Sequence, residues 1–334
     1  MPSEGDIQTM ATLSYAIIGT GAIGGFYGAR LQQAGCDVHF LLRSDYGHVR
    51  QSGLKVDSIE GDFALPQVKA YRDPAALPPV DVAIVALKTT RNHQLCELLP
   101  QIKPGGAILS LQNGFGVEGA IAQQLTEKNL PIPAILGGLC FICSNKVGPG
   151  HFRHLDYGRI LIGAHQETQQ PCLPTTLMKS IVADFTLASI EVATTDDLPM
   201  ARWQKLVWIV PFNGLSVVLD ATTEAMIADE GVRSLITNLM QEVVTLANAW
   251  GKRHSPSFPR QLSGDIITKM QTHTETMPPY RTSMKIDFDE SRPLEIETIL
   301  GNPIREANKL AVPVPNMQML YQQLSFLMSG NCSK

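Results

Sequence analysis

The sequence of 334 residues contains no run of 18 or more apolar residues, so a conventional membrane-spanning helix is not expected. It also lacks long basic or acidic blocks, and its net charge is only −4. Neither nucleic acid nor a membrane is therefore expected as a partner. The opening segment, MPSEGDIQTMATLS, is polar and has no apolar core of a secretion signal. We expect a cytoplasmic protein whose residues 1–12 are a disordered extension.

Cysteine is sparse, and the six cysteines are scattered along the chain, which is typical of a reducing compartment. Only Cys140 and Cys143 have a C-x-x-C spacing, and they lie in an apolar segment with the character of a buried strand. A zinc site would need a second pair of ligands, and the eight histidines show no metal-binding spacing. We therefore expect no metal and a structural role for the two cysteines.

The chain does contain a strand, turn and helix pattern near its start. Residues 15–18 form an apolar run, a Gly-x-Gly-x-x-Gly turn follows, and helix formers continue to Ala34. In such units the first glycine allows the tight turn, the second lets a pyrophosphate approach the backbone, and the third lets the helix pack on the strand. Free N–H groups at the helix start favour a diphosphate. The pattern predicts a dinucleotide site made by Gly19, Thr20, Gly21, Ala22, Ile23 and Gly24.

The next predicted strand, residues 38–42, ends in Arg43. An NAD site usually has Asp or Glu here to bind the ribose diol. A guanidinium instead pairs with a 2′-phosphate and stacks on adenine, which favours NADPH/NADP⁺. Two alternatives stay open: Arg43 is simply solvated, or Asp45 serves a diol at the end of a longer strand.

Alternating strands and helices continue through the first half of the chain. Strands are predicted at 81–87 and 107–111, with a helix at 91–102 between them. Further strands are expected at 135–144, 150–155, 158–164 and 190–193, with a helix at 173–187. This alternation predicts an α/β Rossmann-like domain, a mostly parallel sheet with helices on both faces. Ligands lie beyond the carboxyl ends of such strands, so Lys88 and Asn113 are predicted to face the cofactor.

After residue 195 the strand signals stop. Helices are predicted at 197–219, 223–250 and 293–310. We place the NADP-binding domain at 13–195 and an all-α substrate-binding domain at 196–334. A cleft between the two would take a small substrate. The apolar helices between 204 and 250 fit a core or the interface of a homodimer equally well.

Lys205 is the only charged residue from 203 to 219. An ammonium among so many apolar residues either extends to water or sits in a cleft with a lowered pKa, where it would suit proton donation. Asn213 lies about two turns further along the same helix and is able to share that cavity. The later polar set contains Ser283 one turn before Asp287, and the carboxylates Glu295 and Glu297. The pattern leaves open which carboxylate turns inward.

In this order the residues resemble the ketopantoate reductase (2-dehydropantoate 2-reductase) family over roughly 15–330. The resemblance rests on the glycine turn, Leu87-Lys88, Leu111-Gln-Asn113-Gly114-Phe-Gly, Trp203-x-Lys205-Leu, Asn213, Ser283-Met-x-x-Asp287 and Glu295. It implies NADPH-dependent reduction of the small 2-keto acid 2-dehydropantoate to pantoate, a step toward pantothenate and coenzyme A. It also implies an N-terminal Rossmann-like domain and a helical C-terminal domain.

The resemblance further implies a role for each site residue. Lys205 would be the catalytic general acid, and Glu295, rather than Glu297, would be the catalytic partner of the substrate hydroxyl. Substrate-binding residues would be Asn113, Asn213 and Ser283, the last on the carboxylate. Cofactor-binding residues beyond the glycine turn would be Arg43, Lys88 and Asn113.

Two positions depart from the family pattern. Ile209 stands where asparagine is common, and Thr223 stands at a later polar position that can be asparagine. Loss of these amides leaves open a same-fold NADPH-dependent reductase of another 2-keto acid. A non-catalytic NADP(H)-binding regulator is a third hypothesis. A 6-phosphogluconate-type or hydroxyacid dehydrogenase shares the architecture, but its K-x-x-x-N spacing is broken by Ile209. The sequence does not determine feedback regulation or direction of flux.

Overall fold

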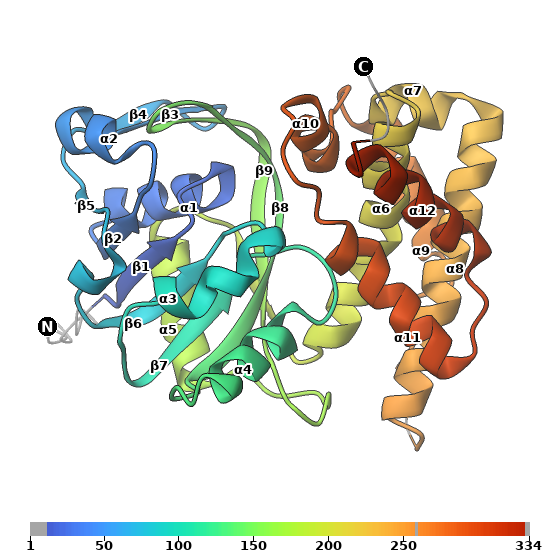
Figure 1. The fold of residues 1–334 in the computed structure, drawn as a ribbon, viewed down its shortest axis with the longest axis horizontal. Coiled ribbons are helices and arrows are strands. Elements are labelled where there is room, and N and C mark those ends of the chain that lie inside the picture. The colour runs from blue at the N-terminus through green and yellow to red at the C-terminus, as the bar shows by residue number, and fades with distance from the viewer. Residues whose placement is uncertain (1–11, 258–259, 331–334) are drawn as a thin grey trace, which may run out of the picture.

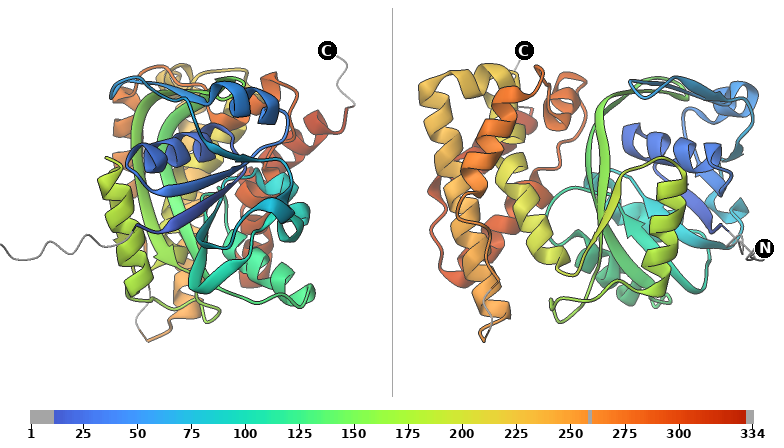
Figure 2. Two further views of the ribbon diagram at one scale, coloured as in Figure 1. Left: turned by 90° about the vertical axis from the view of Figure 1, so that its left-hand side faces the viewer. Right: turned by 180° about the vertical axis from the view of Figure 1, so that it is seen from behind.

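The computed structural model describes residues 12–257 and 260–330. The predicted N-terminal extension therefore lies outside the described residues except for its last position, as does Cys332. An α/β half and a helical half lie side by side (Figures 1 and 2). This arrangement confirms the predicted fold class, a Rossmann-like domain followed by a helical one.

A single sheet forms the centre of the α/β half. Its strands are β1 (Ser14–Ile18), β2 (Asp37–Leu41), β3 (Leu54–Ser58), β4 (Phe63–Leu65), β5 (Lys69–Tyr71), β6 (Val80–Val85), β7 (Ile102–Ser110), β8 (Ala134–Gly148), β9 (His151–Ala164) and β10 (Val192–Thr195). They follow the order β4-β3-β9-β8-β7-β6-β1-β2-β5, with β10 paired to β9. Among the strands of the described residues, only the β3–β4 and β8–β9 pairs are antiparallel. The carboxyl ends of β1, β6 and β7 therefore meet along one edge.

Helices cover both faces of this sheet (Figure 2). They are α1 (Ala22–Gln33), α2 (Tyr46–Ser52), α3 (Leu95–Leu98), α4 (Val117–Glu127), α5 (Thr176–Leu187) and the 3₁₀ turns η1 (Pro74–Ala76) and η2 (Thr89–Gln94). Alternate residues of β1 face opposite sides, so Ile17 packs under α1 and α5 while Ile18 packs under α3 and α4. The apolar run of β1 is thus buried on both faces, which explains why it reads as continuous rather than alternating.

Two element predictions in this half were wrong. The helix predicted at 91–102 is a 3₁₀ turn followed by one turn of α-helix, because the chain turns at Pro100 and enters β7 at Ile102. The strands predicted at 150–155 and 158–164 are one strand, β9. Tyr157 adopts a positive φ of 59° there, and the register with β8 shifts without breaking the ladder.

The helical half begins after β10. It contains α6 (Leu198–Val218), α7 (Thr223–Ala228), α8 (Glu230–His254), α9 (Ile266–Thr276), α10 (Ser283–Asp289), a π-helical turn η3 (Glu297–Gly301), α11 (Asn302–Leu310) and α12 (Pro315–Met328). The helix predicted at 223–250 is split at Asp229, whose carboxylate accepts a hydrogen bond of 2.9 Å from the N–H of Val232 and starts α8. Among the described residues no helix has the length and apolar character to cross a bilayer.

The apolar faces of α6 and α8 pack against each other. Trp203, Leu206 and Val210 of α6 and Leu239 and Val243 of α8 are all buried in one core cluster. These helices therefore supply the core of the helical half, one of the two uses that the sequence left open.

The three glycines of the turn have two different roles, close packing and an open space for a ligand. Gly19 has a φ of +101°, and a Cβ atom there would lie 2.6 Å from the N atom of Leu87. A Cβ atom on Gly24 would lie 2.3 Å from the carbonyl oxygen of Gly19, whereas one on Gly21 would meet no heavy atom within 4 Å. Gly19 and Gly24 thus permit close packing, and Gly21 keeps space open above the start of α1.

These two roles are separable by mutation. We expect Gly24→Ala to lower the free energy of unfolding by about 1–3 kcal/mol, because the added methyl group overpacks against backbone. Gly21→Ala is expected to change it by less than about 0.5 kcal/mol, as for other open positions, and to weaken dinucleotide binding. Urea denaturation and cofactor titration of both variants measure the two effects. Equal destabilisation by both changes would contradict this division.

Candidate active site

Three predicted cofactor-side segments meet at one edge of the sheet. The glycine turn follows β1, Lys88 follows β6 closely, and Asn113 follows β7, and these three strands are direct neighbours. Gly114, which follows Asn113, packs tightly against Thr298 of the helical half, so this edge of the sheet contacts that half. The lysine and the amide therefore lie at the junction between the halves, where Lys88 pairs with Asp287 and Asn113 accepts a hydrogen bond from Lys205.

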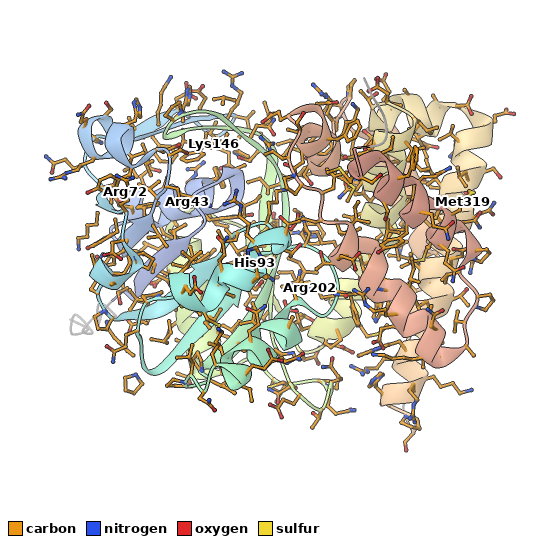
Figure 3. All side chains as sticks on the ribbon, viewed as in Figure 1. Arg43, Arg72, His93, Lys146, Arg202 and Met319 are labelled. Atoms are coloured by element: carbon orange, nitrogen blue, oxygen red, sulfur yellow. The ribbon has the colours of Figure 1, made fainter. Side chains whose placement is uncertain are left out.

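Arg43 lies just beyond β2 and is exposed. Its guanidinium forms no ion pair with a described residue. Arg72 is also exposed and lies just beyond β5, which pairs in parallel with β2. Figure 3 shows both arginines on the α/β half. The sequence pattern did not predict Arg72 as a site residue, because the three residues of β5 are too few to give a strand signal.

Asp45, the alternative ribose ligand, is buried and already engaged. Its Oδ2 atom accepts a hydrogen bond of 2.9 Å from the N–H of Gly150 and lies 2.6 Å from the Nζ atom of Lys146. Burial opposes ionisation, but these two contacts outweigh it and lower the pKa of Asp45 below its usual value. The carboxylate thus anchors the β8–β9 hairpin and is not free for a ribose.

Lys205 reaches from α6 to the sheet instead of extending to bulk water. Its Nζ atom donates hydrogen bonds of 2.8 Å to Oδ1 of Asn113 and 2.8 Å to the carbonyl oxygen of Cys140. It also lies 5.3 Å from the centre of the Phe141 ring. An ammonium has three N–H donors, so one remains for a ligand. Burial lowers the pKa of Lys205 to about 8; the charge of Arg202 acts in the same direction, and the Glu295 carboxylate opposes it.

Glu295 lies at the same junction, with 6% of its surface exposed. Its Oε1 atom accepts hydrogen bonds from the N–H and the hydroxyl of Thr89, at 2.8 and 3.0 Å. Its Oε2 atom lies 3.5 Å from the Nζ atom of Lys88, which also pairs with Asp287 at 2.7 Å. Burial acts to lower the pKa of Lys88, but the two carboxylates raise it above its ordinary value, so the side chain stays charged.

Glu297 points away from this cluster. Its side chain is 59% exposed and pairs with Arg305 at 2.9 Å. The structure therefore places Glu295, and not Glu297, beside Lys88 and within the electrostatic reach of Lys205.

Ser283 and Asn213 lie where α10 meets α6. The Thr282 hydroxyl caps α10 and lies 2.8 Å from the Ser216 hydroxyl of α6, which joins the two helices. Ser283 is half-buried and Asn213 is 3% exposed. Neither side chain has a hydrogen-bond partner among the described residues. Both thus retain polar groups for a ligand.

The two positions that depart from the family pattern are engaged elsewhere. Ile209 packs in the core of the helical half. Thr223 is 1% exposed, and its N–H donates a hydrogen bond of 3.1 Å to the carbonyl oxygen of Tyr280. Thr223 therefore anchors the loop before α10.

Cys140 and Cys143 are both buried on β8 as free thiols. In residues 12–257 and 260–330, no group of three or more His, Cys, Asp or Glu side chains is arranged to hold a metal ion. The contribution of Cys140 to the cluster comes from its main-chain carbonyl.

The chain is similar to proteins of one family over nearly its whole length. Residues 15–167 match the family described as ketopantoate reductase PanE/ApbA, and residues 197–328 match its C-terminal counterpart. A relative from Nostoc sp. named 2-dehydropantoate 2-reductase is 51% identical over 318 residues, which span 95% of this chain and 96% of the relative.

Solved structures show the same similarity. The crystal structure of 2-dehydropantoate 2-reductase from Geobacter metallireducens is 40% identical, covers 94% of this chain and 99% of its own, and superposes with a TM-score of 0.84. A structure of D-mandelate dehydrogenase with NADH and anilino(oxo)acetate has a TM-score of 0.79 at 18% identity, and it covers 95% of this chain and 98% of its own. That second likeness is one of fold alone.

Proposed function

Because the chain belongs to the ketopantoate reductase PanE/ApbA family and is an oxidoreductase, we propose that it reduces 2-dehydropantoate to pantoate with NADPH, a step toward pantothenate and coenzyme A. The observation that carries the proposal is the Lys205 ammonium. It has two donors fixed by Asn113 and Cys140 and a third free at the edge of the sheet. The Nostoc relative, whose name gives this activity, supports the choice of substrate.

The residues at the sheet edge fit NADPH. The open position beside Gly21 and the start of α1, which has no side-chain cap, suit a diphosphate. Arg43 and Arg72 suit the 2′-phosphate, while the engagement of Asp45 with Lys146 argues against a ribose diol ligand there. When bound, the cofactor supplies the hydride to C2 of the ketone.

The protein groups then act on the substrate. Negative charge develops on the ketone oxygen as C2 is reduced, and the free N–H of Lys205 stabilises that oxygen and donates its proton. Asn113 and the Cys140 carbonyl hold the ammonium in place. Oε2 of Glu295 accepts the hydrogen bond of the C4 hydroxyl, and Ser283 and Asn213 bind the carboxylate.

The assay that tests the function compares 2-keto acids directly. NADPH oxidation is followed with 2-dehydropantoate and a panel of other branched and aromatic 2-keto acids, and repeated with NADH. A clearly higher kcat/KM for 2-dehydropantoate with NADPH is expected. A higher value for another ketone would keep the mechanism but reject the substrate, and tight NADPH binding without any turnover would favour a regulatory protein.

The pH dependence of this reaction follows from Lys205. The acid must be protonated, and the pKa of the Lys205 ammonium is about 8. We expect kcat/KM for 2-dehydropantoate to be constant below that pH and to fall as the pH rises through about 8. A steady-state profile at saturating NADPH measures it. A profile that stays flat well above this pH would show that another group donates the proton.

A further inference from the structure

Thr89 holds one oxygen of Glu295 with two hydrogen bonds, from its N–H at 2.8 Å and its hydroxyl at 3.0 Å. The two residues are 206 positions apart and belong to opposite halves of the molecule. Both donors act on Oε1, and Lys88, the preceding residue, faces Oε2. The Lys88-Thr89 dipeptide therefore determines the orientation of the carboxylate, which is 6% exposed.

The direction of the protons in this cluster is fixed by chemistry. An ionised carboxylate only accepts hydrogen bonds, so the Thr89 hydroxyl must donate its proton to Glu295. In the contact of 3.0 Å between the two threonine hydroxyls, Thr298 is then the donor, and the carbonyl oxygen of Glu295, at 3.5 Å, is its more distant acceptor. The chain from Thr298 to Thr89 to Glu295 runs in one direction, and each bond polarises the next. Oε2 is left as the acceptor beside Lys88.

The C4 hydroxyl is the one polar group that 2-dehydropantoate carries in addition to the ketone and carboxylate, which all 2-keto acids share. A site built to bind a hydroxyl rejects an analogue without it, since the buried polar groups of the site are then left unpaired. Such rejection requires that the Glu295 carboxylate cannot rotate to form a hydrogen bond with another group when the C4 hydroxyl is absent. A carboxylate free to rotate would form hydrogen bonds with Lys88 and water through both oxygens. The difference in kcat/KM between a ketone with the C4 hydroxyl and one without it would then be smaller.

We propose that Thr89 is a positioning residue that locks Glu295 and thereby gives the enzyme its selectivity for a 2-keto acid that carries a C4 hydroxyl. The inference rests on the proposed function. It adds a residue that acts indirectly, through the Oε1 atom of Glu295.

The test uses a matched pair of substrates, 2-dehydropantoate and 3,3-dimethyl-2-oxobutanoate, which differ only in the C4 hydroxyl. The ratio of their kcat/KM values is measured for the wild type and for Thr89→Val. We expect the ratio to fall by about 10-fold or more, because a hydrogen bond to a charged group is lost. Most of the change should appear as a higher KM for 2-dehydropantoate. Thr89→Ala serves as a second variant if valine does not fold.

Two further variants separate positioning from a structural role. Thr89→Ser keeps the donor and should restore the ratio to within about 3-fold of the wild type. Thr298→Val removes the hydroxyl contact between Thr298 and Thr89 but leaves both bonds to Oε1, and should also keep the ratio. Thermal unfolding and the Kd of NADPH report on the integrity of each variant.

The outcomes distinguish the inference from the function on which it rests. A strong wild-type preference for the hydroxylated ketone that persists in Thr89→Val and Thr89→Ala would overturn the inference alone, even with a lower kcat for both substrates. A wild type without preference for the hydroxylated ketone would overturn the proposed substrate and, with it, the role of Thr89.

Discussion

Replacement of Lys205 by alanine is expected to lower kcat for 2-dehydropantoate by about 10²–10⁴-fold, the usual contribution of one positioned general acid. The loss follows from the geometry of the ammonium, which is fixed by Asn113 and the Cys140 carbonyl and has one donor left for the ketone oxygen. NADPH affinity should hardly change, because the side chain acts on the ketone as it is reduced. Steady-state kinetics and a fluorescence titration with NADPH measure the two quantities.

Two control variants sharpen this result. Lys269→Ala removes a lysine whose side chain is 68% exposed on α9, and turnover should stay at the wild-type level. Lys205→Arg keeps a positive charge, but a guanidinium releases its proton far less readily, so it should restore only part of the rate. Turnover of Lys205→Ala equal to that of the wild type would reject Lys205 as the acid.

Replacement of Arg43 by alanine is expected to weaken NADPH binding by about 10- to 100-fold, since charge-assisted hydrogen bonds to a phosphate are lost. NADH, which lacks the 2′-phosphate, should bind with nearly unchanged affinity. Arg72→Ala should act in the same direction with a smaller effect, because its strand lies one step further from β1. Kd values for both cofactors, measured at one fixed ionic strength, test this difference.

Arg153→Ala is the matched control for Arg43. Arg153 is also an exposed arginine at a strand of the sheet, but it lies on β9 and pairs with Asp57 of β3. Its removal should leave both Kd values unchanged. Similar losses for NADPH and NADH in Arg43→Ala would show that the arginine does not distinguish the two cofactors.

The parts of the fold that the sequence predicted are those with local determinants. The apolar run of β1, the glycines and the helix formers of α1 lie within 20 consecutive residues, so each element is encoded by its own segment. The apolar length of α6 was equally local. By contrast, β5 has three residues and gives no periodic signal.

The helix predicted at 91–102 shows the limit of periodicity. Leu95, Leu98 and Leu99 have helical spacing and are at least partly buried, yet Pro100 follows at once and β7 begins two residues later. Apolar residues with helical spacing are therefore also buried by a 3₁₀ turn and a single α turn when the next strand begins directly after them.

The candidate site was predicted only in part, because its contacts are non-local. The sequence marked Lys205 as unusual but left open whether it extends to water, and its partners lie 92 and 65 positions away. Glu295 and Glu297 differ by two positions, and only the resemblance favoured the first. The contact between Thr89 and Glu295 joins residues in different halves, and no local pattern predicts it.

The lysine at the centre of this site takes one of its two anchors from the main chain, through the carbonyl of Cys140. Any residue type at that position supplies the same carbonyl, so this anchor does not depend on the side chain of Cys140. In evolution or in engineering, side chains near Lys205 can therefore be exchanged for a new substrate while this anchor of the proton donor is kept. An insertion that slides β8 along its neighbours would displace this carbonyl and, with it, one anchor of the ammonium.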